Sequence, residues 1–468
     1  MATTNLVAMY DATSEQVQSW YHHNKSSEAY LDYFLIREAT LSNINLAAFE
    51  LAVEMLIQRH ESLRTFFNLV EGTLKQCVVP YDRELFRIFC IDITNETEQE
   101  KVITAIIEAN KKELKKINCL PLIRCCLFKT MPATYRVCLM LHHIIADEWS
   151  MSIAEKEISK FYEAIVKGEP VDIAPLKMQL GDYANWQQQW LRENWQVVHD
   201  HWKNILRFCN RFSFEELYNR YMKFSGVPLP VNIRKSITSE NELWNILNRG
   251  KAACCVCCID SLLYSRLKQL SLICKCSIST TFNAGLKILF SMLANKEEVL
   301  LAMPYSNRYI PGTAMLIGCL GGGIYLHQQV IQKMPVKEFV CAVNIESIKA
   351  AQHLIYDHDE MKLDGQKLRI YTDVFVNFVG GEILGEGKLN AERTGTHYAL
   401  EGAEYYALSC SIQEYQDGIL FQWKYNLDLY FSKIIDFMIE RFKALLLAMC
   451  ENSDAAVSDL ITYLMESG

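Results

Sequence analysis

The chain has 468 residues, of which half are hydrophobic and 22% are charged, and its formal net charge is −8. This composition is typical of a globular protein with a large core, and the length predicts two or three domains or one large two-lobed unit. The net negative charge, without a long run of one sign, argues against nucleic acid as a partner, because phosphate binding needs a basic face. We therefore expect a small-molecule or protein partner.

Neither a signal peptide nor a membrane span is predicted. Residues 1–20 lack a basic start followed by an apolar core, and no apolar run reaches the roughly 18–20 residues that cross a bilayer. The stretch Leu286–Leu293 is too short and contains Lys287 and Ser291, so it indicates a buried helix. We expect a cytoplasmic protein with no membrane partner.

The first third of the chain alternates helical and strand-like patterns. Apolar residues recur at helical spacing in some segments, and β-branched and aromatic residues dominate others. In chain order we expect a helix, a strand, a helix, a hairpin around Glu71-Gly72, a helix, two strands and a helix: Ser14–Asn24, Tyr30–Ile36, Asn45–Gln58, Thr65–Val79, Thr97–Leu114, Leu122–Phe128, Tyr135–Leu141 and Met151–Val166.

A break at Lys167–Pro170 separates this part from the rest of the chain. A helical stretch rich in Trp and Gln follows over Tyr183–Leu206, and residues 210–250 are polar and are expected to be irregular. A second α/β unit then begins near Lys251 with a strand, two helices, two further strands and a long final helix: Ala252–Ile259, Asp260–Ile273, Thr280–Ala294, Val299–Pro304, Gly418–Tyr425 and Ser432–Cys450. Both halves mix helices and strands, which predicts two lobes of one architecture, residues 1–175 and residues 176–468.

The chain carries 17 cysteines, and four of them gather in one apolar segment, Cys254, Cys255, Cys257 and Cys258. A metal site is one interpretation of this cluster. However, successive residues of a strand point to opposite faces, so adjacent cysteines do not easily converge on one ion. We expect a buried strand in which free thiols pack as small hydrophobic groups, and no metal site.

The sharpest local signal runs from Leu141 to Ser150, where His142 and His143 leave the end of an apolar strand and enter a loop. A strand end is a rigid support, and histidine can accept a proton from a nucleophile near neutral pH. Asp147, four residues after His143, is within reach to orient the loop through a salt bridge. The alternatives are a hydrogen-bonded core histidine or a metal ligand, although the helical i, i+4 histidine pair of a zinc site is missing.

A second cluster, Arg59–Phe67, lies where a helix passes into a strand. One interpretation is a solvated, charged helix end. The other is that Arg64 supplies the cation for Asp147, because a guanidinium can hold a carboxylate through two hydrogen bonds.

Together these segments resemble the condensation domains of nonribosomal peptide synthetases, which belong to the His-His-x3-Asp-Gly acyltransferase superfamily. Arg59–Phe67 is similar to the family's motif Arg-His-Glu-x-Leu-Arg-Thr-x-Phe at every fixed position, and Leu141–Ser150 is similar to the histidine motif with one change. Looser similarities extend along the chain at Ser14–Trp20, Gly181–Trp186, Pro304–Arg308, Ile317–Cys319, Asp417–Asn426 and Val457–Leu460.

The resemblance implies an α/β fold of two sandwich lobes, each similar to chloramphenicol acetyltransferase, in a V-shaped pseudo-dimer with a central tunnel. It implies that His143 is the catalytic residue in the tunnel, that His142 is a buried supporting residue, and that Asp147 pairs with Arg64 to hold the loop. It also implies carrier proteins as partners, whose phosphopantetheine arms bring the acyl donor to a small-molecule or carrier-bound nucleophile. The chain itself is expected to bind no cofactor.

The sequence departs from the family at two places that the resemblance would put along the tunnel. Glu148 stands where the family has Gly, beside Trp149 and Ser150, and a carboxylate there could narrow the tunnel or repel an acidic substrate. Gly321, Gly322 and Gly323 replace Val-Asn-Thr, which indicates a strand bulge, a flexible turn or extra room. The family's late motifs have no clear counterpart around His353 or Arg369.

We expect an acyltransferase that joins a carrier-bound acyl group to an amine or hydroxyl in nonribosomal peptide biosynthesis. Two alternatives stay open: an inactive docking platform for a carrier protein or an oxygenase, and a coenzyme A-dependent acyltransferase. Neither a nucleotide-binding Gly-x4-Gly-Lys-Ser/Thr loop nor a hydrolase Gly-x-Ser-x-Gly turn occurs in the sequence.

Overall fold

The computed structural model describes residues 6–25, 34–206, 214–230, 246–247, 251–353, 362–363, 366–367, 374–379, 397–401, 406–415 and 418–466. The chain forms two compact units. The first, here called the N-terminal unit, consists of Met1–Lys25, Leu31–Trp195 and Ser306–Gly322, and the C-terminal unit consists of Ser26–Tyr30, Gln196–Tyr305 and Gly323–Gly468. The N-terminal unit thus includes residues 176–195 and 306–322 in addition to most of the first 175 residues. The predicted lobe boundary after residue 175 and the predicted tunnel stay predictions.

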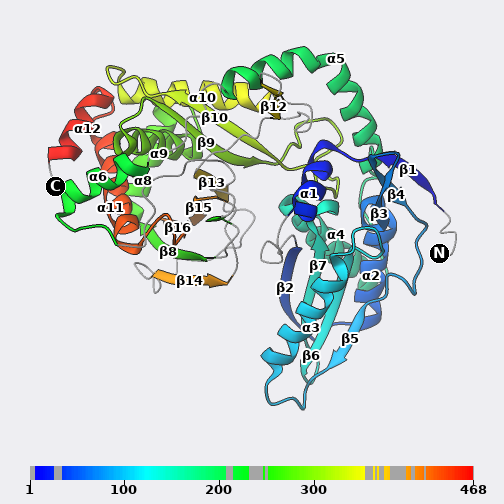
Figure 1. Cartoon of the computed structure of the whole chain (residues 1–468). Coiled ribbons are helices and arrows are strands. Elements are labelled where there is room, and N and C mark those ends of the chain that lie inside the picture. Colours follow the sequence, from blue (N-terminus) through cyan, green and yellow to red (C-terminus); the bar gives the residue numbers. More distant parts are fainter. Residues whose placement is uncertain are drawn as a thin grey trace. The chain divides into compact units, whose positions relative to one another are not determined.

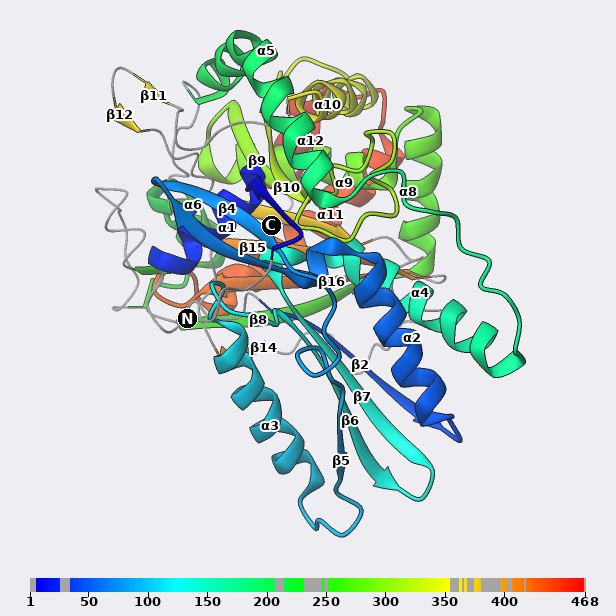
Figure 2. The same ribbon diagram turned by 90° about the vertical axis from the view of Figure 1, so that its right-hand side faces the viewer.

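A four-stranded sheet forms the centre of the N-terminal unit, in the order β2-β7-β6-β5. The strands are β2 (Phe34–Ser42), β5 (Phe89–Asp92), β6 (Ile123–Met131) and β7 (Thr134–His142). They pair antiparallel except for β5 and β6, which run parallel. Helices α2 (Leu46–Arg59) and α4 (Glu148–Lys167) cover one face, and α3 (Gln99–Leu114) covers the other (Figures 1 and 2).

Residues of β6 and β7 alternate between two cores, as the period of a strand requires. Odd-numbered residues such as Leu139 and Leu141 join the core beneath α2 and α4, whereas even-numbered residues such as Cys138 and Met140 join the core beneath α3. At β6 and β7 both faces of the sheet are therefore buried, and this explains why these two strands are almost continuously hydrophobic.

A smaller sheet in the same unit contains β1 (Ala8–Asp11), β4 (Thr73–Val78) and β3 (Thr65–Val70), in that order. The predicted hairpin is confirmed: Glu71 and Gly72 connect β3 to β4, and both have positive φ angles of 50° and 81°. Two successive positive φ values are the mark of the type I′ turn, whose twist suits a hairpin. Helix α1 (Ser14–Lys25) follows β1.

The C-terminal unit is built on a seven-stranded sheet with the order β10-β9-β13-β15-β16-β8-β14. In that order its strands are Gly322–Gln329, Glu298–Tyr305, Val374–Val379, Leu408–Tyr415, Gly418–Asn426, Lys251–Ile259 and His397–Glu401. The described helices are α6 (Phe214–Ser225), α8 (Ser261–Ile273), α9 (Ile278–Ala294), α10 (Val336–Ala351), α11 (Ser432–Glu451) and α12 (Val457–Glu466). The short strands β11 (Lys362–Leu363) and β12 (Gln366–Lys367) pair with each other.

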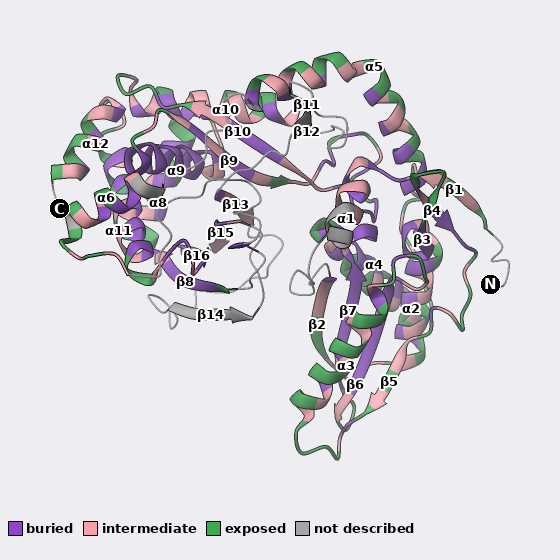
Figure 3. Ribbon diagram, viewed as in Figure 1, coloured by how far each residue is buried: buried purple, intermediate pink, exposed green. Residues whose placement is uncertain are grey.

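Helix α9 is the central helix of the C-terminal unit, since every residue from Thr280 to Ala294 is buried (Figure 3). Its ammonium group at Lys287 donates hydrogen bonds to the carbonyl oxygens of Val299 and Leu326, at 3.3 and 2.6 Å. The predicted buried helix over Leu286–Leu293 is thus confirmed. None of the described helices is long and apolar enough to cross a membrane.

Two expectations for secondary structure need correction. Helix α6 lies inside the segment 210–250 that was expected to be irregular, because Leu217, Tyr218 and Tyr221 pack into the core at helical spacing. Helix α4 begins at Glu148 and not at Met151, because Asp147 caps it. The cysteine-rich strand is confirmed as β8, and in the described parts of the chain no group of three or more His, Cys, Asp or Glu residues could hold a metal ion.

Candidate functional site

The two histidines lie at the carboxyl end of β7. His142 ends the strand, is 1% exposed, and accepts a hydrogen bond at Nδ1 from the amide of Ile144 at 3.0 Å. Its ring also meets the edge of Phe34 at a centroid distance of 5.4 Å. His143 begins a short 3-10 turn, His143–Ile145, and is partly exposed. The strand and the buried His142 therefore fix the base from which the His143 side chain projects.

Asp147 turns the chain into helix α4. Its Oδ1 accepts hydrogen bonds from the amide and the hydroxyl of Ser150, at 2.8 and 2.7 Å, while the Ser150 hydroxyl accepts one from the Asp147 amide. This reciprocal arrangement is a capping box, which satisfies amide groups that the first turn of a helix leaves free. The Ser150 hydroxyl therefore helps to end the histidine loop at Asp147 and to start helix α4 at Glu148.

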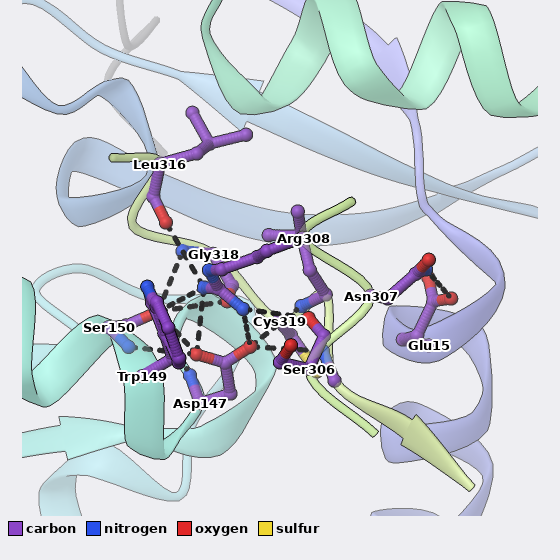
Figure 4. A network of polar contacts seen from close by, with 12 residues as sticks. Glu15, Asp147, Trp149, Ser150, Ser306, Asn307, Arg308, Leu316, Gly318 and Cys319 are labelled. Atoms are coloured by element: carbon purple, nitrogen blue, oxygen red, sulfur yellow. Dashed lines mark hydrogen bonds and ion pairs between the residues drawn. The ribbon is translucent and has the colours of Figure 1, made fainter. Parts of the chain in front are cut away.

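The cation beside Asp147 is Arg308, from the segment Ser306–Gly321 that connects β9 to β10 (Figure 4). Its Nη1 and Nη2 donate to the two carboxylate oxygens of Asp147 at 2.6 and 2.8 Å, and both side chains are less than a tenth exposed. Nη2 also donates to the Ser150 hydroxyl and to the carbonyl of Leu316. Planar guanidinium groups suit this two-point recognition of a carboxylate.

The predicted ion pair between Arg64 and Asp147 is therefore wrong. Arg64 is buried, but its guanidinium donates to the backbone carbonyl oxygens of Ile57, Gln58 and Val79. These contacts connect the 3-10 turn Glu61–Arg64 to the end of α2 and to the residue after β4. The Arg64 guanidinium therefore binds backbone carbonyl groups near the end of α2, and the Asp147 carboxylate binds Arg308 instead.

The segment Ser306–Gly321 is held against the histidine loop by further hydrogen bonds (Figure 4). The amides of Leu320 and Gly321 donate to Asp147 Oδ2 at 3.3 and 2.9 Å. The Gly318 amide donates to the Ser150 hydroxyl at 3.1 Å, and a side chain at Gly318 would place Cβ 2.6 Å from Leu180. A side chain at this position would therefore force the Leu180 and Leu320 side chains to shift.

Within this segment, Cys319 is the residue that reaches His143. Its Sγ lies 3.9 Å from Nδ1 of the imidazole, within range of a hydrogen bond to sulfur. Burial raises the pKa of the Cys319 thiol, and the nearby carboxyl groups of Asp147 and Glu15 raise it further. Cys319 is therefore a neutral thiol in this site.

Beside this site lies a buried carboxyl group, Glu15, in the first turn of α1. It accepts hydrogen bonds from the Gln187 amide at 3.2 and 3.0 Å and a longer one from Asn307 at 3.4 Å. Asn307 and Gln187 also donate to the hydroxyl of Tyr183. Burial, with no cationic partner among the described residues, raises the pKa of Glu15 to about 7.

The residues predicted to line the tunnel have different environments. Glu148 is exposed, forms an ion pair with Arg37 of β2, and is the first residue of α4. Its φ angle is not among the positive ones, so helical geometry alone does not require glycine here. Trp149 donates from its indole nitrogen to the carbonyl of Ala314 at 3.1 Å.

The three consecutive glycines also have φ angles outside the left-handed region. Gly322 and Gly323 are the first residues of β10, so the segment is a strand start and not a left-handed turn. A Cβ atom added to Gly322 would meet no atom within 4 Å. The structure thus leaves space at Gly322, and a role of the three glycines in the tunnel stays a prediction.

The arrangement brings His143 together with Asp147, Ser150 and Trp149 of its own loop, and adds two residues that the sequence reasoning missed, Arg308 and Cys319. Both belong to motifs that resemble the family, Pro304–Arg308 and Ile317–Cys319, but their partners are more than 150 positions away in the sequence. Chemically, the site offers a partly exposed imidazole on a fixed support, next to a carboxylate that is fully engaged in hydrogen bonds.

Comparisons with known proteins define the class. The family model described as condensation domain matches residues 8–241, which is half of the chain. The chain is 26% identical over 441 residues to a linear gramicidin synthase of Brevibacillus parabrevis, and the match covers 90% of this chain and 8% of that protein. The chain therefore spans less than a tenth of the length of this relative.

The fold is similar to solved structures of the same class. A four-domain nonribosomal peptide synthetase matches with a TM-score of 0.72 at 16% identity, covering 98% of this chain and 34% of the other. The X-domain from teicoplanin biosynthesis matches with a TM-score of 0.71 at 18% identity, covering 96% of both chains. The protein belongs to the condensation-domain family of nonribosomal peptide synthetases, and it has the mixed α/β fold of that family.

Proposed function

We propose that this protein transfers an acyl or aminoacyl group from the phosphopantetheine thioester of a carrier protein to an amine or hydroxyl acceptor. The observation that carries the proposal is the position of His143. It is partly exposed at the end of a buried strand, and in the described residues no side chain is hydrogen-bonded to its Nε2. An imidazole nitrogen in this situation can accept a proton from a nucleophile.

The reaction would use His143 as the base. As the acceptor nitrogen or oxygen attacks the thioester carbonyl, Nε2 takes its proton, the carbon–sulfur bond breaks, and the proton passes to the leaving phosphopantetheine thiolate. The chain contributes no bound cofactor to this step. Holding the two reactants together would supply a large part of the rate, since proximity can contribute about 7–11 kcal/mol.

Asp147 would not transfer protons in this scheme. Its Oδ1 accepts hydrogen bonds from the Ser150 amide, the Ser150 hydroxyl and Arg308. Its Oδ2 accepts from Arg308, Leu320 and Gly321. Both carboxylate oxygens are thus engaged by donors of the histidine loop and of the segment Ser306–Gly321. The proposed role of Asp147 is to hold the histidine loop and the segment Ser306–Gly321 in one arrangement.

The test compares the wild type with His143→Ala, and with His199→Ala as a matched control on helix α5 (Leu180–Leu206), at a position outside the site. An acyl-loaded carrier protein is mixed with an amine acceptor, and the product is quantified by mass spectrometry. We expect the product with the wild type and His199→Ala and its loss with His143→Ala. Equal turnover by all three proteins would contradict the role of His143. Replacing the carrier by an acyl-coenzyme A separates the carrier-dependent reaction from a coenzyme A-dependent one.

A second candidate function is an inactive docking platform, and Glu148 is the observation that favours it. A charged side chain occupies the position of the family's glycine and is held by Arg37. The X-domain from teicoplanin biosynthesis, which has a similar fold, has been solved in complex with OxyB. If the wild type is inert and Glu148→Gly gains activity, the platform function is supported. Wild-type turnover above the His143→Ala background would exclude it.

A further inference from the structure

We propose that Cys319 is a positioning residue for His143: its sulfur accepts a hydrogen bond from Nδ1–H and so leaves Nε2 as the nitrogen without a proton. The consequence for catalysis depends on the proposed acyl transfer, whereas the hydrogen bond itself does not. The contact that carries the proposal is the 3.9 Å distance between Cys319 Sγ and His143 Nδ1.

The need for such a partner follows from the chemistry of histidine. A neutral imidazole carries one proton, so it can act as a base at Nε2 only if that proton is on Nδ1. The tautomer is set by the hydrogen bond that the other ring nitrogen makes. In catalytic triads that partner is a carboxylate. Here the candidate carboxylate, Asp147, is occupied by Arg308, Ser150, Leu320 and Gly321.

Cys319 suits the role of a neutral acceptor. It is 3% exposed, and the carboxyl groups of Asp147 and Glu15 disfavour its thiolate. A neutral sulfur is a weak acceptor, and this allows it to orient the ring without strongly stabilising the imidazolium form. Burial also separates Cys319 from solvent, so the thiol is not placed to take an acyl group itself.

The backbone fixes the position of Cys319. The residue before it, Gly318, is hydrogen-bonded to the Ser150 hydroxyl, and the residue after it, Leu320, donates to Asp147 Oδ2. Both hydrogen-bond partners, Ser150 and Asp147, follow His143 within seven residues of the chain. The Arg308–Asp147 pair therefore positions the sulfur against the imidazole as well as holding the loop.

The direct test is the ring tautomer of His143, read from the nitrogen chemical shifts of protein labelled with ¹⁵N-histidine at a pH where the imidazole is neutral. The signal is assigned with His143→Gln. In water the neutral imidazole favours a proton on Nε2, so a predominant Nδ1–H form in the wild type would reveal the proposed hydrogen bond. We expect Cys319→Ala to return His143 toward the Nε2–H form. Cys138→Ala, which removes an equally buried thiol from β7, is the matched control and should leave the tautomer unchanged.

Cys319→Ser extends the test. The carbon–oxygen bond is shorter than the carbon–sulfur bond, so the hydroxyl would lie farther from Nδ1 than the present 3.9 Å and should behave like the alanine variant. An Nε2–H tautomer in the wild type, or a tautomer that Cys319→Ala does not change, would overturn the proposal. Both results are independent of whether the protein transfers acyl groups.

The kinetic consequence is measured separately. If only the Nδ1–H form is competent, kcat should fall with the competent fraction, on the order of fivefold in Cys319→Ala, with an unchanged KM for the acceptor and an unchanged melting temperature. An unchanged kcat together with a changed tautomer would show that the positioning does not serve the reaction. Intact-protein mass spectrometry during turnover should show no acyl adduct on Cys319, and such an adduct would assign the thiol a covalent role and contradict the proposal.

Discussion

Replacing Arg308 by Ala should destabilise the N-terminal unit, because Asp147 would then be a buried carboxylate without a cation. The Arg308 side chain is 3% exposed, and its guanidinium donates two hydrogen bonds to Asp147 and others to Ser306, Ser150 and Leu316. Removing one partner of a buried pair typically costs about 3–5 kcal/mol. Since Asp147 keeps its hydrogen bonds to Ser150 and to two backbone amides, we expect a cost near the lower figure, about 3 kcal/mol.

Urea unfolding followed by circular dichroism measures this loss, and hydrogen–deuterium exchange locates it. The segment Ser306–Gly321 should exchange faster in Arg308→Ala, while β6 and β7 should stay protected. Arg136→Ala is the control, because Arg136 pairs with Glu38 and Glu100 at the surface, and such pairs contribute only about 0–1 kcal/mol. An Arg308→Ala protein with wild-type unfolding and wild-type exchange would refute the assignment of this pair.

Three further predictions concern buried residues of the N-terminal unit. Arg64→Ala should lose about 2 kcal/mol of stability in urea unfolding, because a charged donor to three carbonyls is removed, yet keep its activity; loss of activity at wild-type stability would contradict this. Glu15 has a folded pKa of about 7 against 4.5 in the unfolded chain, so the folded state binds more protons between these values and loses stability as the pH rises. Glu15→Gln has no carboxyl group to titrate, so its free energy of unfolding relative to that of the wild type should rise by about 2–3 kcal/mol from pH 5 to pH 8. If the difference in unfolding free energy between the two proteins is the same at every pH, this prediction is refuted. Gly318→Ala should lower the free energy of unfolding by about 1–3 kcal/mol through the clash with Leu180. A melting temperature equal to that of the wild type would contradict this prediction and show that the Leu180 side chain moves aside without a cost.

Local patterns predicted most of the described elements because hydrophobic period, caps and turns act over a few residues. The hairpin at Glu71-Gly72 and the two-faced strands β6 and β7 are examples. The missed helix α6 had a usable signal in the spacing of Leu217, Tyr218 and Tyr221, which the polar residues between them obscured. The start of α4 was predicted too late because a capping box depends on Asp147 and Ser150 and not on hydrophobic period.

The choice between Arg64 and Arg308 could not be made from the sequence. Both arginines lie in motifs of the family, and a carboxylate accepts either guanidinium equally well. The structure decides because Arg64 finds three carbonyl partners near its own helix end, whereas Arg308 is brought across 161 positions to Asp147. The burial of Glu15 could not be predicted from the sequence either. A glutamate in the first turn of a helix is ordinarily solvated, and its charge interacts favourably with the helix dipole.

The most direct test of the central claim is single-turnover acyl transfer by wild type and His143→Ala, with carrier and acceptor saturating so that binding does not limit the rate. General base catalysis by a positioned side chain typically contributes about 10²–10⁴-fold. We predict a loss in this range for a His143→Ala protein that folds like the wild type. Equal single-turnover rates for the two proteins would contradict it.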